Sequence, residues 1–176
     1  MKVLVCSLLL VSKLVALTII LPMRDKLPQQ EEPVHWAYSA KKLDQNKYEI
    51  HLTASMNVGW HIYAQEQPKE AIAIPTKIKI SLNPLIAMIG KVIEIGKREK
   101  HEIKEVGIVQ YEYQDTVDFV QVISVKANIK TNISGIVSFQ ACTDKKCLPV
   151  KAVSFNISVN SHEYTASFQN IPIPDV

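Results

Sequence analysis

The chain has 176 residues, of which 47% are apolar and 21% charged, so it can bury the core of one domain and is not disordered throughout. Its formal net charge is +3, and 18 basic and 17 acidic residues follow Leu21. This balance gives no electrostatic case for binding nucleic acid or an anionic membrane surface.

Residues 1–21 are expected to direct export. Lys2 precedes a mostly apolar stretch, and Pro22 ends any helix there. Lys13 interrupts the stretch and no clear small-residue cleavage site follows it, so an uncleaved amino-terminal anchor is the alternative to a cleaved signal peptide. Residues 22–33 are polar, contain three prolines and are expected to form a linker.

Residues 34–160 alternate apolar and polar side chains with a period of two, which predicts strands rather than helices. Turn residues separate the runs, and they include Gly96, Gly107 and the stretch 132–135. Seven to nine short strands at this spacing favour an antiparallel β-sandwich. The tail at 161–176 is rich in proline at its end and is expected to lie on the surface. The expected strands are Trp36–Ala40, Tyr48–Ala54, Trp60–Ala64, Thr76–Ile80, Val92–Ile95, Tyr111–Tyr113, Val117–Val125, Val137–Ala141 and Val153–Val159.

Two cysteines, Cys142 and Cys147, remain after the signal segment. An even count in an exported chain implies a disulfide. Four polar residues separate them, so we expect a β-hairpin with the cysteines facing each other at its mouth. Opposed residues of antiparallel strands have Cα atoms about 4.5–5.5 Å apart, and a disulfide tolerates about 4.4–6.8 Å.

The spacing leaves two interpretations of this pair equally open. A structural disulfide across six residues would stabilise the fold by only about 2 kcal/mol. A redox-active pair would be favoured by Lys145 and Lys146, which promote the thiolate, and opposed by Asp144. A zinc site would need two further ligands at a suitable spacing, which the sequence lacks, so we expect no metal and no cofactor.

The five histidines show no metal-ligand spacing, and His61 is the one of interest because it lies in an aromatic segment with Trp60 and Tyr63. Aromatic residues in a strand more often belong to the core than to a site. No motif supports Ser/His/Asp catalysis or a phosphate-binding loop.

Three stretches together resemble a known family: GWHIYAQ at 59–65, Pro75-Thr76, and FQACTDKKCLP at 139–149. They resemble the amino-terminal periplasmic domain of the thiol:disulfide interchange protein DsbD family. The resemblance covers roughly residues 34–159, and the last motif is the most specific.

This resemblance implies an immunoglobulin-like antiparallel β-sandwich in the periplasm. It also implies that the cysteine pair is redox-active, takes electrons from a membrane-embedded domain and reduces periplasmic disulfide proteins. In the family a loop with an aromatic residue caps the pair. Here Val106 or Ile108 would lie near that position, and Tyr111 follows several residues later.

The leading hypothesis is therefore a periplasmic thiol–disulfide oxidoreductase, with Cys142 favoured as the attacking sulfur and a separate membrane protein as electron donor. Its partners would be thiol–disulfide exchange proteins. We expect no binding to nucleic acid. We expect contact with a membrane only if the amino-terminal segment is retained. The alternative is a non-enzymatic immunoglobulin-like binding or adaptor domain with a structural disulfide, since such sandwiches support many functions.

Overall fold

A computed structural model describes residues 31–126 and 129–160, so the expected signal segment, most of the linker and the tail lie outside the described residues. The described part contains nine strands and no helix, and hence no helix that could cross a membrane. The strands are β1 (Val34–Lys42), β2 (Lys47–Met56), β3 (His61–Tyr63), β4 (Lys77–Ile80), β5 (Ile86–Ile103), β6 (Ile108–Val125), β7 (Lys130–Phe139), β8 (Ala141–Cys142) and β9 (Lys151–Asn160).

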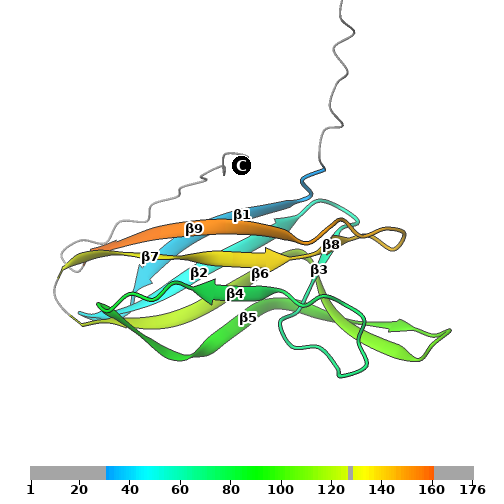
Figure 1. The fold of residues 1–176 in the computed structure, drawn as a ribbon, viewed down its shortest axis with the longest axis horizontal. Coiled ribbons are helices and arrows are strands. Elements are labelled where there is room, and N and C mark those ends of the chain that lie inside the picture. The colour runs from blue at the N-terminus through cyan, green and yellow to red at the C-terminus, as the bar shows by residue number, and fades with distance from the viewer. Residues whose placement is uncertain (1–30, 127–128, 161–176) are drawn as a thin grey trace, which may run out of the picture. The chain divides into compact units, whose positions relative to one another are not determined.

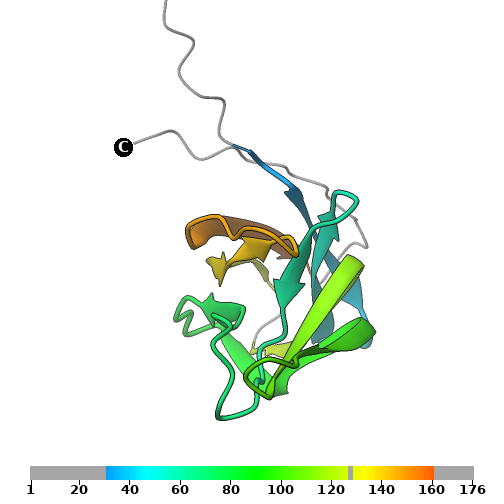
Figure 2. The same ribbon diagram turned by 90° about the vertical axis from the view of Figure 1, so that its right-hand side faces the viewer.

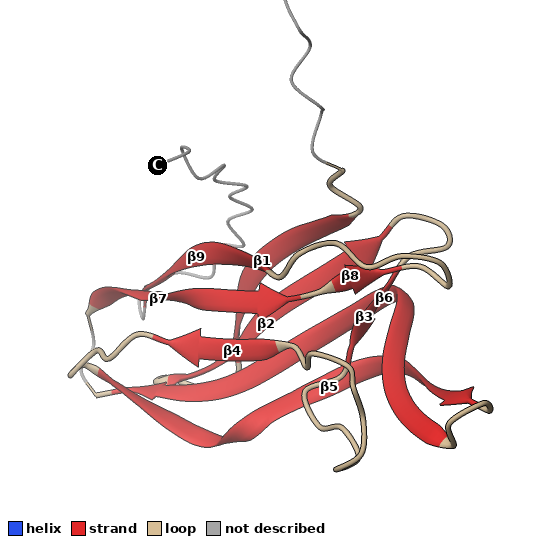
Figure 3. Cartoon of the chain, turned by 45° about the vertical axis from the view of Figure 1, so that its right-hand side comes forward, coloured by secondary structure: helices blue, strands red, loops and turns tan. Residues whose placement is uncertain are grey.

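The strands form two antiparallel sheets (Figure 1). The larger sheet has the order β1-β2-β6-β3-β8, with β5 paired along the other edge of β6, and the smaller has the order β4-β7-β9. Seen end-on, the larger sheet curls around the smaller one (Figure 2). The described part is thus an all-β, immunoglobulin-like sandwich, as the sequence predicted (Figure 3).

Aromatic side chains from both sheets meet in the core. Trp36 on β1 lies with its ring centroid 5.4 Å from that of Phe139 on β7 and 5.9 Å from that of Phe119 on β6. The ring centroid of Tyr38 lies 5.7 Å from that of Phe155 on β9. Such pairs add about 0.5–1.5 kcal/mol each to the stabilisation that burial provides. Trp36 and Tyr38, at alternate positions of β1, therefore connect the larger sheet to the smaller one.

The sequence placed a break at Gly96 and divided the 111–125 region into two strands, and both expectations are wrong. β5 and β6 each run for 18 residues. Their register shifts between the pairs Gly96–Val117 and Arg98–Tyr113, and Asp115 at this point has a φ of 58°. A bulge of this kind bends a strand. β6 therefore pairs with β3 as far as Gln114 and with β2 from Thr116 onward.

The turn expected at 132–135 is also wrong, because these residues lie inside β7. Gly135 is there for a packing reason. A Cβ at this position would lie 2.4 Å from the Lys79 carbonyl oxygen on β4 and 2.5 Å from the Phe155 ring. A glycine within a strand often marks such a close approach of neighbouring groups.

The chain changes sheets at Gln140. β7 pairs with β9 as far as Phe139, opposite Lys151. After Gln140 the chain enters the larger sheet as β8, which pairs with β3. The Gln140 side-chain amide donates a hydrogen bond of 3.1 Å to the Leu148 carbonyl, which joins the two ends of the intervening segment. The residues between β8 and β9 therefore project from the end of the sandwich.

We expect Gly135→Ala to lower the free energy of unfolding by about 1–3 kcal/mol, as overpacking does. The gain from a less flexible unfolded chain, about 0.4–1 kcal/mol, is too small to offset this. Urea unfolding of the purified domain measures the change, with Ser138→Ala on the same strand as the control. A Gly135→Ala domain as stable as the parent would contradict the close packing of β4, β7 and β9.

Candidate functional site: a disulfide hairpin beside a buried His–Glu pair

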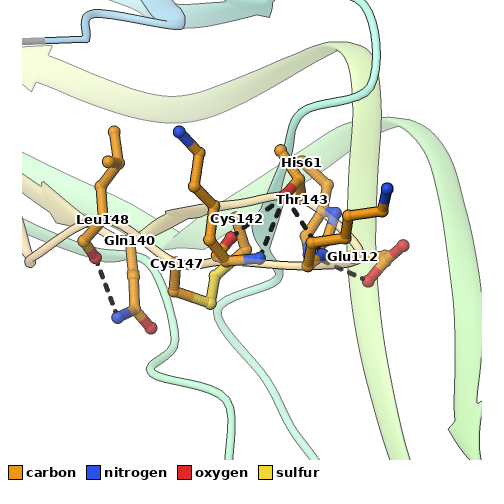
Figure 4. The surroundings of a disulfide bond; sticks show 9 residues. His61, Glu112, Gln140, Cys142, Thr143, Cys147 and Leu148 are labelled. Atoms are coloured by element: carbon orange, nitrogen blue, oxygen red, sulfur yellow. Dashed lines mark hydrogen bonds and ion pairs between the residues drawn. A yellow bond between two sulfur atoms is a disulfide. The ribbon is translucent and has the colours of Figure 1, made fainter.

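The Cys142–Cys147 disulfide closes a tight hairpin at the end of the sandwich (Figure 4). The two cysteines are opposed in antiparallel fashion, with Cα atoms 4.0 Å apart. Backbone hydrogen bonds flank them, from the Thr143 amide to the Lys146 carbonyl at 2.7 Å and from the Leu148 amide to the Ala141 carbonyl at 2.9 Å. The predicted disulfide and its hairpin are present.

The turn of this hairpin is held by one side chain. The Thr143 hydroxyl oxygen accepts hydrogen bonds from the amides of Lys145 at 3.2 Å and Lys146 at 3.1 Å. A hydroxyl in this position satisfies backbone donors that the turn leaves unpaired. The hairpin therefore has its own local support, independent of the disulfide.

The two cysteines differ sharply in exposure. Cys142 is fully buried on β8, where it is paired with His61 of β3. Cys147 is exposed and lines an open pocket of about 250 Å³. A reagent from solution can therefore reach the Cys147 side of the bond and not the Cys142 side.

His61 lies next to Cys142 in the sheet. The two residues are directly opposed in the β3–β8 ladder. The His61 Nε2 atom is 3.5 Å from Oε2 of Glu112 on β6, and the two side chains are only 8% and 4% exposed (Figure 4). The bend in β6 brings Glu112 to this position. A buried histidine–carboxylate pair thus lies beside the cysteines.

The surroundings of His61 favour its neutral form. Burial lowers the pKa of His61, while the negative charges of Glu112 and Asp144 oppose the shift and His101 adds to it. The Tyr63 ring packs edge-on against the imidazole at 5.3 Å between centroids. Burial likewise raises the pKa of Tyr63, with the Glu112 charge acting in the same direction. Both side chains are therefore uncharged near neutral pH.

The pocket draws residues from four parts of the chain that lie at the same end of the sandwich: β3, the β3–β4 connection, the β5–β6 hairpin and the cysteine hairpin (Figure 1). Within the described residues, no group of three or more His, Cys, Asp and Glu side chains is arranged to hold a metal ion. The lining residues are His61, Tyr63, Ile72, Ala73, His101, Ile103, Gln110, Glu112, Gln140, Thr143, Asp144 and Cys147.

Several residues suggested by the sequence meet here. Cys147, Asp144, His61 and Tyr63 line the pocket. Trp60 lies beside the hairpin, with the Lys146 ammonium 5.4 Å from its ring centroid. This cation–π contact attaches the turn to the start of β3.

Three other suggested residues do not line the pocket. Val106 is 63% exposed in the turn between β5 and β6. Tyr111 faces Arg98, whose guanidinium carbon lies 4.6 Å from its ring centroid. Lys145 is exposed in the turn of the cysteine hairpin.

Sequence reasoning did not single out five residues that line the pocket: Glu112, Gln110, His101, Ile103 and Ile72. Glu112 and Gln110 lie at alternate positions of a strand, which shows only that they share a face. Both are nevertheless buried, at 3% and 4% exposure. That burial depends on the pairing of β3 with β6 and on the β5–β6 hairpin, which local patterning does not specify.

The family model for the thiol:disulfide interchange protein DsbD, N-terminal, matches residues 26–158. The chain belongs to this family. The match includes both cysteines, His61 and Glu112, and therefore the whole candidate site. No curated protein matches the sequence.

One solved structure agrees with this assignment at the level of the fold. The N-terminal periplasmic domain of ScsB from Proteus mirabilis is 15% identical, with a TM-score of 0.53 over 80% of this chain and 50% of that one. This chain thus spans half the length of that ScsB structure. Weaker similarity is found to two Neisseria meningitidis structures. One is the DsbD N-terminal domain in the reduced form, with 14% identity, a TM-score of 0.49 and coverage of 77% and 90%. The other is a complex between the DsbD and PilB N-terminal domains, with 13% identity, a TM-score of 0.44 and coverage of 75% and 87%.

We expect reduction of the disulfide to leave the domain folded. Closing a six-residue loop constrains the unfolded chain by only about 2 kcal/mol, against a typical domain stability of about 5–15 kcal/mol. Urea unfolding of the oxidised and reduced forms, monitored by tryptophan fluorescence, measures the difference. Loss of the folded baseline on reduction would instead identify a disulfide on which the fold depends.

Proposed function

We propose that the domain carries out thiol–disulfide exchange in the periplasm, using Cys142 and Cys147 to pass electrons from a separate membrane protein to disulfide-containing proteins. Membership of the DsbD amino-terminal family supports this proposal. The observation that carries it is the unequal exposure of the two sulfurs, one open to a pocket and one enclosed by the sheet. Exchange needs one thiol that meets the partner and one that releases it.

Cys147 is the partner-facing cysteine in this proposal. An attacking thiolate must approach a partner's disulfide directly, and the exposed Cys147 can do so. The buried Cys142 then attacks Cys147 within the mixed disulfide and restores the internal bond. The weak preference for Cys142 as attacker, made from the sequence, is replaced here because the sheet covers that residue.

Two isoleucines border the exposed sulfur in this proposal. Ile72 in the β3–β4 connection and Ile103 at the end of β5 line the pocket with Cys147. The connection is fastened to β6 by Gln67, which donates to the Tyr111 carbonyl at 2.6 Å and accepts from the Tyr111 amide at 2.9 Å. Cys147 itself stays exposed, so these apolar side chains would border the sulfur without covering it.

The single-cysteine variants test the proposal. With glutathione disulfide as the probe, Cys142→Ser should form a stable mixed disulfide at Cys147. Cys147→Ser should react at least about tenfold more slowly, because the remaining thiol is buried. Intact-protein mass spectrometry counts the adduct over time, and the serine at either position keeps the side chain nearly the same size.

The reduced parent protein provides the control. It should react with glutathione disulfide and end as the internal disulfide with no adduct. Failure of Cys142→Ser to form any adduct while its Cys147 thiol still reacts with an alkylating reagent would argue against exchange. The binding or adaptor domain with a structural disulfide would then be the better account.

A further inference from the structure

We propose that His61 accepts the proton of Cys142 when that thiol resolves a mixed disulfide, and that Glu112 positions the imidazole for this step. The inference rests on the proposed exchange function and extends it to a residue outside the cysteine hairpin. It assigns a role to the buried His61–Glu112 pair, whose side chains are 8% and 4% exposed.

The need for a proton acceptor follows from burial. The thiolate is the attacking form of a cysteine. The exposed Cys147 can lose its proton to water, but Cys142 is fully buried and has no such route. Burial disfavours a charged sulfur unless a base lies beside it. The second half of the exchange therefore depends on a group inside the protein.

The sheet places one base next to this thiol. His61 is the direct cross-strand partner of Cys142, and side chains at such positions have Cβ atoms about 4.5–5.5 Å apart. The other ionisable groups around the imidazole are Glu112 on β6, Asp144 in the cysteine hairpin, His101 on β5 and Tyr63 on β3. Among these groups, His61 alone is in register with Cys142.

The electrostatics suit a proton acceptor. Because burial lowers the pKa of His61, the ring is neutral at pH 7 and can take up a proton. Nε2 lies 3.5 Å from a Glu112 carboxylate oxygen, which positions the ring beside its cross-strand partner Cys142. The imidazolium that forms lies beside the carboxylates of Glu112 and Asp144, both of which stabilise its charge.

Resolution by Cys142 moves one proton and exchanges one disulfide bond for another. The Cys142 S–H bond breaks, its proton goes to His61 and the sulfur becomes a thiolate. This thiolate attacks Cys147 Sγ, the Cys142–Cys147 bond forms, and the bond from Cys147 to the partner's sulfur breaks. The partner leaves as a thiolate, and His61 returns the proton to it or to solvent. The two electrons of the cysteine pair have then passed to the partner, and a dithiol protein resupplies them.

Reaction of the fully reduced domain with 5,5′-dithiobis(2-nitrobenzoate) separates the two halves of this process. Attack by Cys147 releases one equivalent of the coloured thiolate, and resolution by Cys142 releases the second. We expect His61→Gln to slow the second release at pH 7 by about a hundredfold, the lower end of the range for loss of a general base. The first release should change by less than about twofold. Glu112→Gln should slow the second release to a smaller extent.

His51→Gln is the matched control, since His51 also pairs with a carboxylate, Asp118, at 2.6 Å but is not among the residues that line the pocket. It should leave both releases unchanged. An equal second release in His61→Gln and the parent would overturn the inference. Absence of a second release from the parent itself would instead overturn the proposed function.

The pH profile of the parent gives an independent test that needs no substitution. With a histidine acceptor, the rate of the second release should rise as His61 loses its own proton, below the ordinary histidine pKa of about 6.5, and then level off. A rate that climbs about tenfold per pH unit from pH 6 to 8 without levelling would show that hydroxide, and not His61, removes the proton.

Discussion

The passage of the chain from one sheet to the other at Gln140 determines the rest of the site. β7 belongs to the smaller sheet and is held there by its pairing with β9. One residue later, β8 belongs to the larger sheet and pairs with β3. A continuous β7–β9 hairpin would have kept Cys142 in the smaller sheet. The change of sheet buries it and sets it opposite His61.

The bend in β6 is the second feature on which the site depends, because it places Glu112 beside His61. The bulge around Asp115 directs one half of β6 to β2 and the other to β3. Glu112 lies in the half that pairs with β3, and it meets His61 on that neighbouring strand although 51 positions separate the two residues in the chain. A buried carboxylate needs a compensating partner, and the histidine provides one. The core packing of Trp36, Phe119 and Phe139 holds both layers in the arrangement that this contact requires.

Much of the fold followed from the sequence, because a period of two is a local property. The alternation at 48–54 and 153–159 predicted β2 and β9 correctly. The turns predicted at Gly96 and Gly135 were wrong, because glycine is also found at bulges and at close packing contacts. Gly96 lies at a bulge, and Gly135 lies in a close packing contact. The cysteine hairpin was also predictable, because its spacing is short. The pairing of His61 with Glu112 was not, since it depends on which strands become neighbours and on a bend that no local pattern specifies.

The central claim is that the Cys142–Cys147 bond is exchanged and does not serve mainly to hold the fold together. Its reduction potential tests this most directly. The domain can be equilibrated with glutathione buffers of graded ratio, quenched, and the fraction of disulfide measured by mass. An exchange-active pair should be reduced within the range of these buffers, at a potential above about −300 mV. A bond that stays oxidised at every ratio, with a potential below that value, would contradict the account.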